Sequence, residues 1–185
     1  METITKENLI VDLENAFQEV VDWVNSQSEE HLNTVIYPDK WTAAGHVFHL
    51  VKSTKSVSKG MGMNKLALRT MFGKNNRTEK TYEEVLHKYN TGLSNLKQSD
   101  PVAAANISSK FAAEPGRIFE KEVLLKRFDD ELKDMSKIIL KWNEVDLTNY
   151  IMPHPAIGKL TMREFIYFTI LHTKHHLRIL REQYS

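Results

Sequence analysis

Apolar residues recur at helical spacing along almost the whole chain, and this pattern constrains the fold more than any other feature. Between residues 6 and 27 apolar side chains return every three or four positions, the repeat of an amphipathic helix. They are Leu9, Ile10, Leu13, Phe17, Val20, Val21 and Val24. No stretch alternates apolar and polar residues for long enough to indicate a strand. The sequence therefore predicts an all-α protein.

Three further long helices are predicted from the same periodicity, over about residues 42–60, 117–142 and 161–183. The last of them begins with a capping box, in which Thr161 and Glu164 would satisfy each other's backbone N–H groups. Four long helices joined in this order predict a four-helix bundle. In such bundles, sites are built from side chains that point inward from facing helices.

The long connection between the second and third bundle helices carries a shorter amphipathic pattern over residues 81–97. This pattern starts with a second capping box, Thr81 with Glu84, and predicts an additional helix in a crossover connection. Residues 99–116 are the least regular stretch and are expected to form a long connection folded onto the body of the molecule. Residues 152–159 are expected to form a turn. The predicted fold class is an all-α four-helix bundle with one additional helix.

The composition is that of an ordinary globular protein, and 185 residues fit a single domain over residues 1–185. The chain has no cysteine. This excludes disulfides, thiolate metal sites and cysteine nucleophiles, and agrees with a reducing, cytoplasmic location. No run of about eighteen apolar residues occurs, so no membrane partner is expected. The charged N-terminal segment is also unlike a signal peptide.

Two of the eight histidines, His172 and His176, stand four positions apart in the last predicted helix. At this spacing both imidazoles lie on one helix face, where they can reach a single metal ion. The same face carries apolar residues such as Phe168, so it should point into the bundle. A buried, hydrogen-bonded pair without a metal is the alternative. Zinc-protease chemistry is disfavoured because Thr173 replaces the glutamate base of that motif.

The second predicted helix offers a third histidine, His49, with His46 one turn before it. Gly45 and Ser53 lie one turn to either side of His49 along its row, and such small side chains would leave room for a ligand. Close helix packing at Gly45 is the alternative. Gly45, His46 and Ser53, together with Lys52 and with Thr169 on the last helix, are the candidate pocket residues.

Two motifs stand in a characteristic order. A tryptophan–threonine pair precedes a histidine–leucine pair that comes eight residues after the tryptophan, and a G-x-L-T-x-x-E segment leads into H-x-x-x-H. They occupy Trp41, Thr42, His49, Leu50, Gly158, Leu160, Thr161, Glu164, His172 and His176. With these motifs the chain resembles the DinB/YfiT-like family of helical-bundle proteins. The resemblance implies a four-helix bundle with a divalent metal ion, usually nickel or zinc, held by His49, His172 and His176.

The resemblance also implies a range of activities, since family members with known activities include thiol transferases that use small thiol cofactors. Two departures separate this chain from the pattern: Lys52 stands where many members have an acidic residue, and the stretch 61–116 is longer than in the simplest members. Both lie near the expected substrate entrance. A thiol cofactor is therefore compatible with the resemblance, but no residue of this sequence supports it.

Lys52, Lys55 and Lys59 follow His49 along one helix. A cationic mouth above a divalent ion would attract anions, which predicts an anionic small molecule as the ligand. The alternative is that the long stem of Lys52 carries its charge out to solvent. Both interpretations remain open at the level of sequence.

The leading functional hypothesis is a metal-dependent enzyme, an S-transferase or a hydrolase, that acts on a small and possibly anionic molecule. The alternative is a non-catalytic metal- or ligand-binding stress-response protein. Nucleic acid is a disfavoured partner, because the basic run over residues 52–80 lacks interleaved aromatic residues apart from Phe72. A homodimer remains open.

Overall fold

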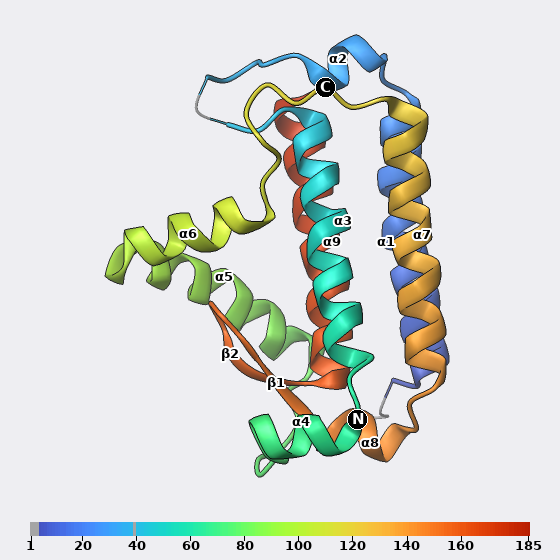
Figure 1. Cartoon of the computed structure of the whole chain (residues 1–185), viewed down its shortest axis with the longest axis vertical. Coiled ribbons are helices and arrows are strands. Elements are labelled where there is room, and N and C mark those ends of the chain that lie inside the picture. Colours follow the sequence, from blue (N-terminus) through green and yellow to red (C-terminus); the bar gives the residue numbers. More distant parts are fainter. Residues whose placement is uncertain (1–3, 39) are drawn as a thin grey trace.

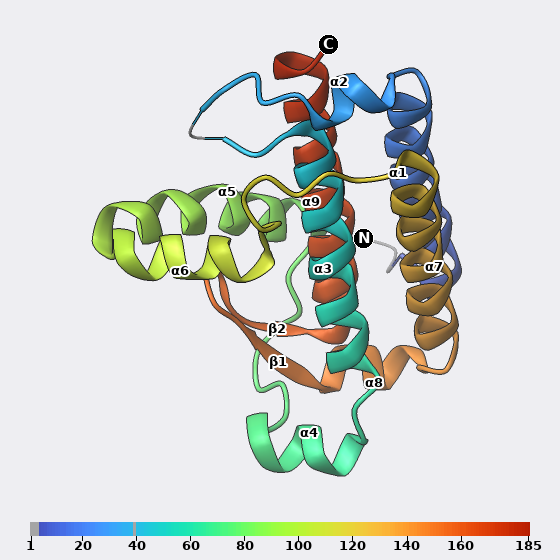
Figure 2. The same cartoon turned by 45° about the horizontal axis from the view of Figure 1, so that its top comes forward.

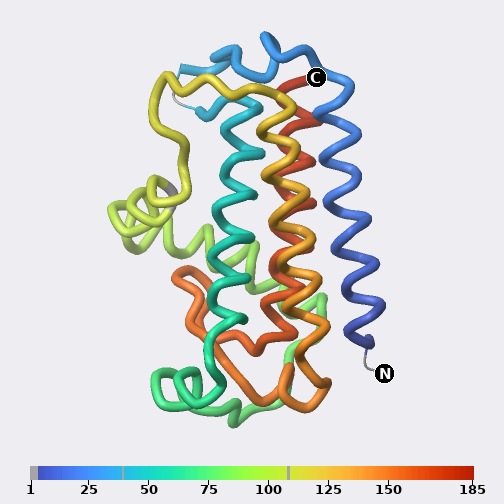
Figure 3. The backbone as a smooth tube through the Cα atoms, turned by 45° about the vertical axis from the view of Figure 1, so that its right-hand side comes forward, coloured from blue at the N-terminus to red at the C-terminus, as the bar shows by residue number. Residues whose placement is uncertain are grey.

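Four long helices run side by side and form the body of the molecule (Figures 1 and 3). The computed structural model describes residues 4–38 and 40–185. The bundle helices are α1 (Lys6–Asn25), α3 (Ala43–Met61), α7 (Lys121–Leu140) and α9 (Met162–Gln183). Around the bundle, α1 packs on α7, α7 on α3, α3 on α9, and α9 on α1. The predicted all-α, four-helix-bundle fold is confirmed.

The apolar stripes that predict these helices form the interior of the bundle. Leu13, Phe17 and Val20 of α1 are fully buried, and so is Phe128 of α7. The rings of Phe17 and Phe128 stack with their centroids 4.2 Å apart, which fixes the spacing between α1 and α7. The two bundle helices that face the remaining structure are α3 and α9.

The crossover between α3 and α7 contains three helices: α4 (Lys65–Phe72), α5 (Tyr82–Ser99) and α6 (Pro101–Phe111). The prediction of one additional helix here is correct for α5 but misses α4 and α6. The start of α6 follows a local rule, because the Asp100 side chain accepts the Ala103 N–H and a proline occupies the first helical position. Figure 2 shows α5 and α6 as an arm that projects from the side of the bundle.

A short antiparallel hairpin precedes α9, where only a turn was expected. It consists of β1 (Ile151–His154) and β2 (Gly158–Thr161). Each strand has only four residues, and β1 contains a proline. Such short strands do not show an alternating pattern of apolar and polar residues in the sequence. Two small helices, α2 (Glu29–Asn33) and α8 (Glu144–Asn149), complete the described elements. None of the described helices has the length and apolar character needed to cross a bilayer.

A buried carboxylate ties the crossover to the start of α9. Glu164 is fully buried, forms the predicted capping box with Thr161, and accepts two hydrogen bonds from the Arg77 guanidinium, at 2.7 and 2.5 Å. The backbone N–H of Lys80 donates a further bond at 2.6 Å. Burial alone would raise the pKa of Glu164, but these donors hold that pKa below its ordinary value. The segment before α5 is thereby anchored beside the hairpin.

Candidate metal centre and cavity

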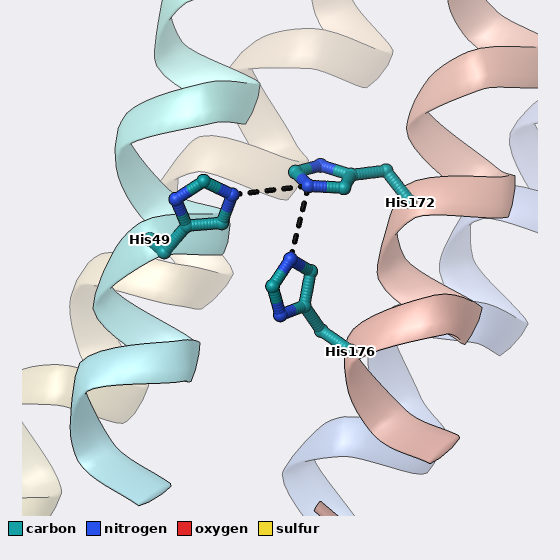
Figure 4. A group of neighbouring side chains, drawn as sticks. All are labelled: His49, His172 and His176. Atoms are coloured by element: carbon teal, nitrogen blue, oxygen red, sulfur yellow. Dashed lines mark hydrogen bonds between the residues drawn. The ribbon is translucent and has the colours of Figure 1, made fainter. Parts of the chain in front are cut away.

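Three histidines converge between α3 and α9 (Figure 4). The Nε2 atom of His172 lies 3.0 Å from Nε2 of His49 and 3.1 Å from Nε2 of His176. His172 and His176 stand one turn apart on α9, and His49 faces them from α3. All three side chains are buried in the protein. The three residues that the sequence motifs single out are therefore neighbours in space.

Neighbouring groups orient two of the three imidazoles. The Ser53 hydroxyl donates to the Leu50 carbonyl at 3.1 Å, so its oxygen is free to accept a hydrogen bond from Nδ1–H of His172 at 3.4 Å. Nδ1 of His176 lies 2.9 Å from Nδ1 of His46 and shares a hydrogen bond with it. Both contacts engage Nδ1 and direct Nε2 toward the centre of the cluster. Such outer partners fix the tautomer and orientation of histidines that bind metals.

Burial favours the neutral form of these rings. It lowers the pKa of His49 to about 4, against the opposing effect of the Phe111 backbone, and Lys52 lowers it further. Burial and the neighbouring histidines also hold the pKa values of His172 and His176 well below their ordinary range. Neutral imidazoles present lone pairs, which is the state that a metal ion requires.

The cluster fits a single divalent ion. Three nitrogens bound at about 2.0–2.1 Å around one ion would stand roughly 3.3–3.4 Å apart at tetrahedral angles. Nε2 of His172 lies 3.0 Å from that of His49 and 3.1 Å from that of His176, within a few tenths of an ångström of this spacing. Nε2 of His172 has one lone pair and lies near two other Nε2 atoms, so it cannot form a good hydrogen bond with both. A cation between the three nitrogens would accept a lone pair from each of them.

The three histidines form part of the wall of a cavity of about 450 Å³. On α3 the lining residues His49, Ser53, Ser56 and Gly60 follow one helix row, and the small members of this row leave the space open. The other walls come from α5, α6, α9 and the hairpin. They are mostly apolar, with side chains that include Leu93, Ile107, Phe111, Met152, Phe165 and Phe168. The volume is within the ordinary range for small-molecule sites.

Of the five candidate pocket residues, the structure places only Ser53 on the cavity wall. His46 lies behind His176. Thr169 bonds within its own helix, its hydroxyl donating to the Phe165 carbonyl at 2.9 Å. Gly45 is buried against Trp41, where an added Cβ would come within 3.1 Å of the tryptophan Cβ. Gly45 thus lies at a close packing contact.

Lys52 is also absent from the cavity wall. Its ammonium group donates to the Ala112 carbonyl at 3.1 Å and stands over the Phe48 ring, 5.6 Å from the centroid. The predicted attraction of anions assumed that Lys52 stands at the mouth of the site. In the structure the lysine that lines the cavity is Lys97 of α5.

Several lining residues could not be singled out from the sequence. Tyr89 of α5 is buried against Phe168 and lies edge-on to the rings of His172 and His175, with ring centroids 6.1 and 5.7 Å apart. The Phe111 ring, at the end of α6, lies 6.0 Å from that of His49. Their side chains reach the histidines only because the α5–α6 arm folds back over α3 and α9.

Trp41 is both part of the sequence motif and part of the cavity wall. Its ring lies nearly parallel to that of His176, with an interplanar angle of 12° and centroids 6.2 Å apart. It also packs on His49 at 4.7 Å. The tryptophan therefore shields the triad at one end of the cavity.

Comparison with known proteins agrees with this architecture. The family model described as the DinB superfamily matches residues 12–180, which include α3, α7, most of α1 and α9, and the three histidines. Neither the curated proteins nor the solved structures give a significant match. With the helical bundle, the histidine triad and a family match over most of its length, the chain belongs to the DinB superfamily.

Proposed function

We propose that His49, His172 and His176 hold one divalent metal ion and that the protein is a metal-dependent enzyme acting on a small molecule in the adjoining cavity. The observation that carries this proposal is the convergence of three neutral, buried imidazoles on the wall of a cavity of about 450 Å³. A structural metal site is usually closed on all sides, whereas a catalytic site leaves a position open.

The chain's own residues prepare this site. Ser53 and His46 direct the lone pairs of His172 and His176 inward, and Trp41 shields the cluster from one side. When bound, the ion would supply Lewis-acid activation of a nucleophile such as water or a thiol. Nickel and zinc both suit an imidazole donor set. Transfer of a group to or from a thiol, and hydrolysis, are the two reaction types that we propose.

A non-catalytic metal- or ligand-binding role is the second candidate. It is favoured by one observation: the described residues that line the cavity include no aspartate or glutamate. The wall thus offers no carboxylate that could serve as a general base beside a metal-bound water. The two candidates share the metal centre and differ only in whether chemistry follows binding.

The first experiment measures metal content. Protein purified without a nickel column should contain about one divalent ion per chain by elemental analysis. His172→Ala should lose most of this metal, because only two of the three imidazole ligands remain. His175→Ala, which removes the neighbouring histidine outside the triad, should keep the wild-type content. Equal metal content in His172→Ala and wild type would refute the proposed centre.

A second measurement separates the two candidates. Zinc- and nickel-loaded protein is assayed with an aryl ester and with an electrophilic chloroarene plus a small thiol, beside His172→Ala and metal-free protein. An enzyme should turn over one of these probes only with the triad intact and loaded. Metal binding with no turnover of either probe would favour the binding role.

A further inference from the structure

The cavity extends well beyond the histidine triad. On α3 its wall runs from His49 to Gly60, eleven helical steps that span about 16 Å at the rise of an α-helix. On α9 it runs from Phe165 to His176, again eleven helical steps. Phe72 and Met63 line the cavity beyond the bundle helices. The space is thus an elongated slot that has the metal-binding histidines toward one end.

Apolar side chains form most of this slot. From α5 and α6 it receives Leu93, Leu96 and Ile107, and from the hairpin Met152 and Pro153. The wall also carries polar side chains, among them two serines, Tyr89, Lys97 and five histidines. A ligand that fills the slot must therefore present mostly apolar surface, because burying polar groups without partners is costly.

The described wall of the slot carries no carboxylate that could attract a cation. Among the described lining residues the ionisable groups are Tyr89, Lys97 and five histidines, with no carboxylate. Arg178 lies just outside the wall, with Nη2 3.5 Å from Nδ1 of the lining residue His175. A positive ligand would find no carboxylate to pair with on the described wall. A negative ligand would meet the charges of Lys97 and Arg178 and, with the ion bound, the proposed cation as well.

We infer that the slot binds an amphiphilic anion, a molecule with an apolar body up to about 16 Å long and one acidic group at the histidine end. This inference deepens the proposed function, since it rests on the same cavity and names the class of substrate that would meet the metal centre. It also assigns the preference for anions to Lys97, Arg178 and the proposed cation, in place of Lys52.

Three probes with the same ten-carbon chain test this inference: decanoate, decan-1-ol and decyltrimethylammonium. Each is titrated calorimetrically into EDTA-treated protein and into zinc-loaded protein. Decanoate should bind one site in both forms, at least about tenfold more tightly than the ammonium probe and more tightly than the alcohol. Equal affinity for the three probes, or no binding of decanoate, would overturn the inference.

Two pairs of variants locate the ligand. Lys97→Glu should weaken decanoate binding about two- to fivefold, the usual range for one exposed ion pair. Lys88→Glu, the same charge change on an exposed residue of α5 that does not line the cavity, should have no effect. Ser56→Leu fills the slot and should weaken decanoate at least about tenfold, while Lys59→Leu on the exposed side of α3 should not. Unchanged binding in Ser56→Leu would place decanoate elsewhere and refute the inference.

The two failures remain distinguishable, because metal content is measured on the same samples. A protein that binds zinc through the triad but ignores decanoate retains the proposed metal centre and loses the amphiphilic ligand. If the protein binds decanoate in the slot but holds no metal, the proposed metal centre is refuted and the amphiphilic ligand is retained. Melting curves of Ser56→Leu and Lys97→Glu show that each variant is folded before it is titrated.

Discussion

At the scale of single residues, His46 acts on the candidate site without touching the cavity. Its Nδ1 holds Nδ1 of His176 at 2.9 Å, and burial lowers the pKa of His46 to about 4, with the charge of His49 as a further cause. His46→Ala would leave Nδ1 of His176 without this partner and free its ring to turn. Loss of such an outer partner typically lowers metal affinity about 10- to 100-fold. We expect this loss in a competition titration against a chromophoric chelator.

Two further variants make the His46 result specific. His46→Asn keeps a side-chain group able to share a hydrogen bond and should recover part of the affinity. His87→Ala removes an exposed histidine of α5 that does not line the cavity, and should bind zinc as the wild type does. If His46→Ala matched the wild type, His46 would be a packing residue only.

At the scale of elements, the Arg77–Glu164 pair holds the crossover segment against the start of α9. Arg77→Ala would leave the fully buried Glu164 carboxylate without two of its hydrogen bonds. Breaking a buried pair in this way typically costs about 3–5 kcal/mol of unfolding free energy. Lys80 still contacts the carboxylate, at 3.3 Å, so the lower end of that range is expected. Urea unfolding monitored by circular dichroism measures the loss.

The matched control for this pair is Arg181→Ala. It breaks the ion pair with Glu19, in which both side chains are about half exposed, at 54% and 47%. Exposed pairs contribute little, so the unfolding free energy should change by less than about 1 kcal/mol. Similar losses in Arg77→Ala and Arg181→Ala would contradict the structural role of the buried pair.

At the scale of the whole molecule, buried histidines make stability depend on pH. Burial lowers the pKa values of His46, His49 and His154 to about 4, whereas in the unfolded chain they take up protons near 6.5. Below about pH 6.5 the unfolded state therefore binds more protons than the folded state. The free energy of unfolding of the metal-free protein should fall steadily from pH 7 to pH 5, by roughly 2 kcal/mol for each such histidine.

Urea unfolding of EDTA-treated protein at several pH values tests this dependence. A bound ion stabilises only the folded state, so the zinc-loaded protein should be more stable at pH 7 and lose this advantage as acid displaces the metal. Constant stability of the metal-free protein between pH 7 and pH 5 would show that the histidines are accessible to protons in the folded state.

Local physics determined much of this protein from its sequence alone. Helical periodicity predicts the four bundle helices, and the hydroxyl of Thr161 with the carboxylate of Glu164 predicts the start of α9. The spacing of His172 and His176 places both on one face, because side chains four apart share a face in any α-helix. Each of these features depends on residues within a few positions of one another. Features that depend only on nearby residues can be predicted from the sequence without a structure.

Tertiary packing decided the rest. The spacing of His172 and His176 says nothing about His49, which was linked to them through a resemblance; the contact of α3 with α9 brings it within 3.0 Å. The α5–α6 arm and the hairpin close the cavity. Which lysine lines it depends on how the arm folds over α3, so Lys97 lines the wall and Lys52 does not. These features join residues far apart in the chain, and their positions follow from which helix faces can bury one another, a property that no single segment contains.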